Sequence, residues 1–137
     1  MMKVQAIIPA AGKGLRLKVR QAKALIVLKN KPLIVYSLEA FQGSSLIDSI
    51  ILVVPPGQLE TFFKIIKRYT LWKVRKIVEG GKTRRQSVAN GLKALAKDTE
   101  LVLIHDAARP FITRELIDSA VLKAKKDKAV VVGIPVK

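Results

Sequence analysis

A chain of 137 residues is long enough to form one hydrophobic core but not two, so we expect a single domain, 1–137. Half of the residues are hydrophobic, which excludes a disordered chain, and no apolar run approaches the roughly 20 residues that span a bilayer. The absence of cysteine and the single histidine exclude disulfides and a zinc centre. We therefore expect a packed cytoplasmic protein in which any catalytic metal is a hard ion bound by oxygen.

The net charge of +16 at pH 7 invites a nucleic-acid interpretation, because clustered cations bind phosphate backbones. The lysines are spread along almost every segment, however, and aromatic residues are few. No helix-turn-helix, RRM-like or zinc-finger spacing occurs. A generally basic surface accounts for the charge equally well, so nucleic acid and membrane are not the partners that we expect.

Short apolar blocks rich in valine and isoleucine alternate with segments of helical period along the chain. The blocks are mostly continuous rather than alternating, which predicts strands buried on both faces of a sheet. The predicted strands are residues 4–8, 50–54, 74–78, 101–104 and 129–134.

A helix is predicted after each of the first four strands. Pro32 and Gly43 delimit the first helix, and Thr83 and Thr113 are placed to cap the third and fourth. The alternating order predicts an α/β fold with a largely parallel sheet, helices on both faces, and ligands at the carboxyl ends of the strands. The cluster of lysines at 123, 125, 126 and 128 is expected to be the solvated end of the last helix. The apolar stripes are Leu59, Phe62, Phe63 and Ile66; Val88, Leu92 and Leu95; and Ile117, Ala120, Val121 and Ala124.

The loop after the first strand reads "PAAGKGLRLKVRQAKA". Gly12 and Gly14 let backbone amides approach an anion closely, and the cations of the loop can neutralise its charge. The stretch matches neither the Walker pattern nor the G-x-G-x-x-G fingerprint, so a basic surface loop remains the alternative for this motif alone. The cations are Lys13, Arg16, Lys18, Arg20 and Lys23.

The third strand is followed by "VEGGKTRRQSVANGL". The glycine pair permits close backbone approach, and Thr83 is placed to cap the next helix. Arg84 and Ser87 lie on the first turns of that helix, where exposed amides and the helix dipole favour negative charge. A serine nucleophile would need a base, and the single histidine, His105, ends another strand; serine catalysis is therefore not expected.

The fourth strand leads into "LVLIHDAARPF". Asp106 follows the apolar strand directly, as a ligand of a hard cation would, and Arg109 offers a planar guanidinium suited to phosphate. His105 is expected to be a structural residue at the strand end. Together the three loops supply glycine backbone, several cations and one carboxylate, which predicts a site for a nucleoside triphosphate.

The segments "IIPAAGKGLRL", "EGGKTRRQSVANGL" and "LVLIHDAARPF", in this order, resemble the 2-C-methyl-D-erythritol 4-phosphate cytidylyltransferases from Val4 to the last residue. The resemblance implies a Rossmann-like nucleotidyltransferase fold. It also implies transfer of CMP from CTP to methylerythritol phosphate with Mg²⁺ and release of pyrophosphate. A cytidylyltransferase for another polyol phosphate, such as ribitol 5-phosphate, and an inactive nucleotide-binding module remain as alternatives.

By matching position, the resemblance implies that Arg16 and Lys23 hold the triphosphate and stabilise the transition state. Asp106 would face the metal or the polyol, and Arg109 would place the substrate phosphate. The residues implied in the cytidine pocket are Ala10, Ala11, Gly12, Lys13, Gly14, Gly81, Lys82 and Ser87.

The chain departs from the family pattern in two places. Ala22-Lys23-Ala24 stands where the family commonly has Pro-Lys-Gln, which keeps the lysine and loses the stiffening proline. Family members also continue well beyond "GIPVK" into acceptor-binding residues and an arm that forms a homodimer. We therefore expect the nucleotide-binding part of such an enzyme, with a homodimer where the arm exists.

Overall fold

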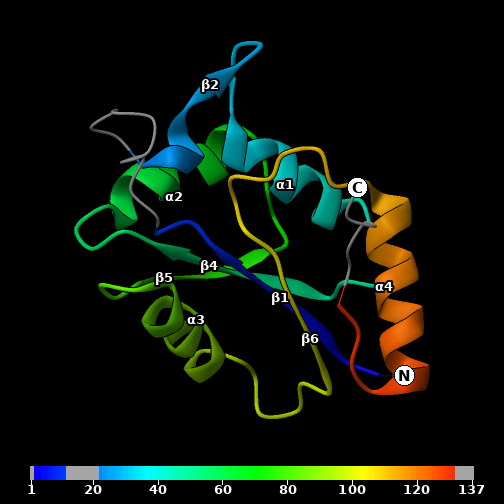
Figure 1. Cartoon of the computed structure of the whole chain (residues 1–137). Helices are drawn as coiled ribbons and strands as arrows, with labels where there is room; N and C mark the ends of the chain where they lie inside the picture. Colours follow the sequence, from blue (N-terminus) through cyan, green and yellow to red (C-terminus); the bar gives the residue numbers. More distant parts are fainter. Residues whose placement is uncertain (1, 12–21, 132–137) are drawn as a thin grey trace, which may run out of the picture.

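The computed structural model describes residues 2–11 and 22–131, and a four-stranded parallel sheet lies at its centre (Figure 1). The strand order is β5-β4-β1-β6. Four predicted strands are confirmed to within one residue at each end. They are β1 (Val4–Pro9), β4 (Ser49–Val54), β5 (Val74–Glu79) and β6 (Leu101–Ile104).

β1 occupies the interior of the sheet and pairs with β4 on one side and β6 on the other. Ile7 lies opposite Ile51 in β4 and Ile104 in β6. The chain runs outward from β1 through β4 to β5 and then returns to the far side of β1. This reversal places the loop after β1 beside the loop after β6, which is the position where parallel sheets bind ligands.

Helices cover both faces of the sheet, as predicted (Figure 1). The helices α1 (Leu33–Gln42), α2 (Leu59–Arg68) and α4 (Arg114–Asp127) pack on one face, in a core that includes Ala6 and Ile8 of β1. On the other face, Ile7, Ile51 and Val53 form a second core beside α3 (Arg84–Lys93). Within the described ranges, no helix is long and apolar enough to cross a membrane.

The start of α1 differs from the prediction. Pro32 is the N-cap of the helix rather than its first residue, because its ψ of 144° is extended. It belongs instead to a hairpin of β2 (Val27–Leu28) and β3 (Lys31–Pro32) that the sequence analysis did not predict. The positive φ angles of Lys29 (50°) and Asn30 (67°) are those of a two-residue type I′ turn, for which Asn is a favoured residue.

The buried face of α3 also differs from the predicted stripe of Val88, Leu92 and Leu95. Ser87 and Gly91 are the buried residues of this helix, whereas Leu92 is 45% exposed. Small side chains face the sheet because α3 lies very close to it, so that a Cβ atom on Gly91 would be 2.7 Å from Cγ2 of Ile7.

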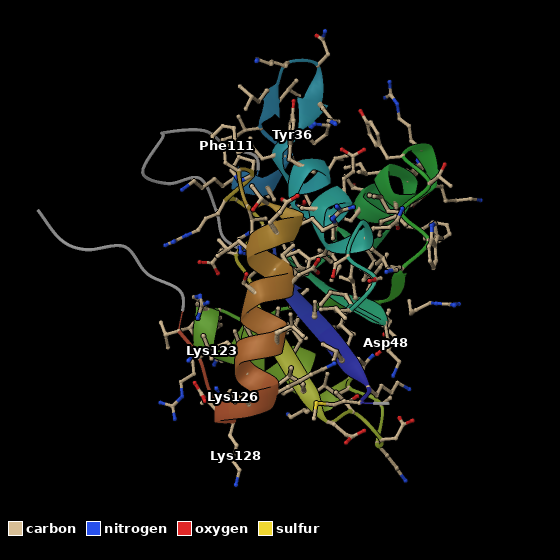
Figure 2. The ribbon with its side chains drawn as sticks, turned by 90° about the vertical axis from the view of Figure 1, so that its right-hand side faces the viewer. Tyr36, Asp48, Phe111, Lys123, Lys126 and Lys128 are labelled. Atoms are coloured by element: carbon tan, nitrogen blue, oxygen red, sulfur yellow. The ribbon has the colours of Figure 1, made fainter. Side chains whose placement is uncertain are left out.

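The C-terminal end of the described chain confirms one prediction and contradicts part of another. Figure 2 shows Lys123, Lys126 and Lys128 on the outside of α4, and all three residues are exposed, as expected for a solvated helix end. The fifth predicted strand, 129–134, is wrong for residues 129–131, which are not in a strand. The rest of that prediction lies outside the described residues.

We predict that Gly91→Ala lowers the free energy of unfolding by about 1 kcal/mol, because overpacking against Ile7 and Val53 outweighs the gain in helix propensity. Urea unfolding measures this change. Gly43→Ala is the matched control, since a Cβ there comes no closer than 3.3 Å to any atom. An equal or smaller loss for Gly91→Ala than for the control would contradict the close packing of α3.

Candidate functional site

Hydrogen bonds extend the sheet into the loops at its carboxyl edge. The amide of Ala10 donates to the carbonyl of Val53 at 2.6 Å, and the amide of Ala107 donates to that of Pro9 at 3.0 Å. The amide of Gly80 donates to the last carbonyl of β4 at 2.7 Å. The loops after β1, β5 and β6 therefore begin side by side, as the sequence analysis predicted from the fold class.

The loops after β1 and β5 are in direct contact. A Cβ atom on Gly80 would lie 2.7 Å from Cβ of Ala11 and would also collide with Ser87, so only glycine fits there. Ser87 is buried, and its hydroxyl oxygen accepts a hydrogen bond from the amide of Gly81 at 3.2 Å. The structure thus brings together Ala11, Gly81 and Ser87, three residues that were predicted to bind the nucleotide.

A capping box closes the N-terminus of α3, as the placement of Thr83 predicted. The Thr83 hydroxyl accepts from the amide of Gln86 at 3.1 Å, and the Gln86 side chain accepts from the amides of Thr83 and Lys82 at 3.3 and 2.7 Å. Three amides at this helix end therefore already have protein acceptors. The helix dipole and the exposed side chain of Lys82 remain to attract an anion at this helix end.

The carboxylate of Asp106, in the loop after β6, lies between two arginines. Its Oδ1 accepts from Nε of Arg84 at 3.1 Å and lies 3.1 Å from Nη2 of the same guanidinium. Its Oδ2 lies 3.9 Å from Nε of Arg109. The contact with Arg84 joins the loop after β6 to the first turn of α3, and no motif in the sequence predicted it.

The backbone of the loop after β6 is held by α1 and by His105. The buried hydroxyl of Ser37 lies 3.2 Å from the carbonyl of Ala107 and 3.1 Å from that of Arg109. Nε2 of His105 lies 3.0 Å from the Arg109 carbonyl, which can only accept, so Nε2 carries the proton. The His105 ring also packs on Phe41, with centroids 5.4 Å apart. His105 therefore has the structural role expected of it.

Burial lowers the pKa of His105 below its ordinary value of 6.5, against a smaller upward effect of the hydrogen bond to Arg109. The imidazole is therefore neutral at pH 7. Ser37 gave no signal in the sequence beyond a lone hydroxyl within an apolar helix. Its function as an anchor depends on a loop 70 residues away, which only the fold brings close.

Lys23 begins the short 3-10 helix η2 (Lys23–Leu25), which packs on α1. The alanines that flank it, Ala22 and Ala24, are buried, whereas Lys23 is exposed. A backbone hydrogen bond of 2.9 Å from Leu25 to Ala22 closes the turn. The turn is therefore formed with Ala22 in place of the proline that the resemblance implied. The predicted residues Gly12, Lys13, Gly14 and Arg16 lie outside the described residues.

The described residues include no group of three His, Asp or Glu side chains that could bind a metal ion by themselves. Asp106 was predicted as a metal ligand, and both of its oxygens face guanidinium groups. Mg²⁺ commonly binds through one or two carboxylates together with the phosphates of its substrate. A single carboxylate is compatible with a cation whose other ligands are the phosphate oxygens of a nucleotide.

A separate groove of about 490 Å³ lies between α2 and β5. Its walls are mainly apolar, and it lacks the glycine backbone and the paired arginines of the loops described above. The candidate site is therefore the loop cluster and not this groove. The lining residues are Leu59, Glu60, Phe63, Ile66, Val74, Arg75 and Ile77.

Comparison with known proteins gives a family for this chain. The model of the family IspD, 2-C-methyl-D-erythritol 4-phosphate cytidylyltransferase, matches residues 4–137. Curated enzymes of that name from Alkaliphilus metalliredigens and Clostridium botulinum (strain Loch Maree) are 48% and 46% identical to this chain over 136 and 134 residues. Both matches cover 98% of this chain but only 56% and 58% of the relative. The chain thus spans just over half the length of these relatives.

A solved structure agrees with this result. The crystal structure of 4-diphosphocytidyl-2C-methyl-D-erythritol synthase from Anaerococcus prevotii superposes with a TM-score of 0.77 at 32% sequence identity. The match covers 91% of this chain and 52% of that one. The α/β nucleotidyltransferase fold predicted from the sequence is confirmed.

We predict that His105 makes stability depend on pH. Because its pKa is lower in the folded state than the unfolded value of 6.5, the unfolded chain binds more protons below that pH. The contribution to stability is therefore complete above pH 6.5 and is lost as the pH falls toward the folded pKa. Urea unfolding between pH 7.5 and 5 measures this loss, which we expect to be smaller in His105→Gln. Parallel pH profiles for the two proteins would contradict it.

Proposed function

The chain belongs to the 2-C-methyl-D-erythritol 4-phosphate cytidylyltransferase family, and from that premise we propose that it forms the nucleotide-binding part of such an enzyme. The enzyme would transfer CMP from CTP to 2-C-methyl-D-erythritol 4-phosphate and release pyrophosphate. The observation that supports this most directly is the meeting of three loops at one edge of the sheet. They bring glycine backbone, a helix N-terminus and two arginines to one place.

The proposed reaction needs alignment and positive charge more than proton transfer. A phosphate monoester has a second pKa near 6 and is largely dianionic at pH 7, so it is already a nucleophile. One of its oxygens bonds to the α-phosphorus of CTP while the bond from that phosphorus to the bridging oxygen breaks. Pyrophosphate then leaves with the electron pair. The neutral, hydrogen-bonded His105 is consistent with a site that uses no acid-base pair.

The residues divide between the two substrates. We propose that Lys23 binds the triphosphate and stabilises the charge that develops on the leaving pyrophosphate. Arg109 would bind the phosphate of the acceptor, and Asp106 would contact its polyol hydroxyls. The backbone and side chains that would surround the cytidine are those of Ala10, Ala11, Gly81, Lys82 and Ser87.

Mg²⁺ would enter with the nucleotide, and when bound it would neutralise the triphosphate and polarise its phosphoryl oxygens. The residues of this chain would position the two substrates. The tight contact of Ala11 with Gly80 fixes the spacing of the two nucleotide loops. Ser37 and His105 fix the backbone that carries Arg109. Such preorganisation is how an enzyme aligns two anionic substrates before the reaction.

The first test is an assay of this 137-residue chain for pyrophosphate release from CTP and Mg²⁺, with and without methylerythritol phosphate. We expect release that depends on the acceptor. Ribitol 5-phosphate in place of methylerythritol phosphate tests the alternative acceptor. No release with either acceptor, together with thermal stabilisation by CTP, would reduce the chain to a nucleotide-binding module. The absence of pyrophosphate release and of stabilisation by CTP would contradict the proposal.

We predict that Lys23→Ala lowers kcat/KM by about a hundredfold or more, because it removes a charge that stabilises the transition state. The melting temperature should not change, since Lys23 is exposed. Lys97→Ala removes the same charge from an exposed position before β6, at the opposite edge of the sheet, and serves as the control. Calorimetric titration with CTP and Mg²⁺ compares the affinity of the two variants for the nucleotide without the need for turnover. Equal behaviour of the two variants would exclude Lys23 from the site.

A further inference from the structure

Arg84 lies on the first turn of α3, yet its guanidinium contacts the loop after β6. Two of its nitrogens, Nε and Nη2, lie 3.1 Å from the same oxygen, Oδ1 of Asp106. This contact connects the proposed nucleotide loop at Gly81 with the proposed acceptor loop. No backbone hydrogen bond of the described residues directly joins those two loops.

Asp106 also has a nearer partner in sequence. Arg109 lies three residues further along the same turn, and its amide donates to the Asp106 carbonyl at 3.1 Å. An aspartate and an arginine at the two ends of one turn can form a close ion pair. The observed distance from Oδ2 to Nε of Arg109 is 3.9 Å, however, and the Arg109 side chain is 79% exposed. The carboxylate is therefore held by the arginine that is distant in sequence.

We propose that Arg84 is a positioning residue that holds Asp106 away from Arg109 and so leaves the Arg109 guanidinium available for a phosphate. The carboxylate of an aspartate rotates readily about its last side-chain bond, because that torsion has no strongly preferred staggered positions. Two contacts from Arg84 to Oδ1 fix the rotation. Without them, the carboxylate turns toward Arg109, pairs with it and occupies the donors that an acceptor phosphate needs.

This competition gives Asp106 two opposite effects on Arg109. While Arg84 is present, the charge of Asp106 orients Arg109 through a loose contact. When Arg84 is removed, the same charge neutralises Arg109. Loss of Arg84 should therefore weaken binding of the acceptor and leave binding of CTP unchanged. The size of this effect should also depend on whether Asp106 is present, whereas an effect of Arg84 that is independent of Asp106 would be the same with and without it. The inference rests on the proposed binding of the acceptor phosphate by Arg109.

The test compares Arg84→Gln with Arg85→Gln, which removes the same charge from the next residue, also exposed, of the same helix turn. We expect Arg84→Gln to raise the KM for methylerythritol phosphate about fivefold, the size of a charge-pair effect at an exposed site. The KM for CTP and the melting temperature should remain unchanged, and Arg85→Gln should alter none of the three. A double-mutant cycle with Asp106→Asn adds the dependence on Asp106: the second substitution should cost less in the Arg84→Gln background than in the unmodified chain.

A second readout does not need turnover. The side-chain Nε–H signal of Arg109, assigned by its loss in Arg109→Gln, is followed by ¹⁵N NMR in the ligand-free chain. In Arg84→Gln we expect this signal to shift, its exchange with water to slow, and its response to added inorganic phosphate to weaken. Arg85→Gln should leave it unchanged. If the signal is the same in Arg84→Gln and the unmodified chain, the inference is wrong, even where the chain turns over its substrates. If it changes as expected in a chain that shows neither turnover nor stabilisation by CTP, the proposed function fails and the positioning role remains.

Discussion

The parallel pairing of β1 with β4 and β6 is the constraint on which the rest of the structure depends. Parallel strands end at the same edge of the sheet, so the loops that follow them begin within a few ångströms of one another. Hydrogen bonds from Ala10, Gly80 and Ala107 extend the ladder by one residue into those loops. Residues separated by about 100 positions in the sequence thereby become neighbours at this edge of the sheet.

Small side chains allow the loops and α3 to approach one another closely at this edge of the sheet. Gly80 admits Ala11 and Ser87, and Gly91 lets α3 settle against Ile7. The same proximity explains why the larger apolar residues of α3 do not form its buried face. A helix that approaches the sheet this closely has room only for glycine and serine at the contact. Arg84, on the first turn of this helix, then contacts Asp106 in the loop after β6.

The arginines of the candidate site are arranged around one carboxylate, that of Asp106. A surface with an excess of lysine and arginine attracts any polyanion, which provides little selectivity. Asp106 places a single negative charge between two arginines, in close contact with Arg84 and in loose contact with Arg109. Ser37 and His105 hold the backbone beneath them. Arg84 is thus held by the carboxylate, whereas the Arg109 side chain is left exposed.

The sequence by itself determined the α/β class, the four described strands of the sheet, both threonine caps and the position of the loops that form the candidate site. These features depend on local periodicity, on capping residues and on motifs that are contiguous in the chain. Only the tertiary structure decided which face of α3 is buried, that Ser37 anchors the loop after β6, and that Asp106 pairs with Arg84 rather than with Arg109. Each of these depends on how closely two distant segments approach. That distance is set by packing across the whole sheet, and no local pattern of residues encodes it.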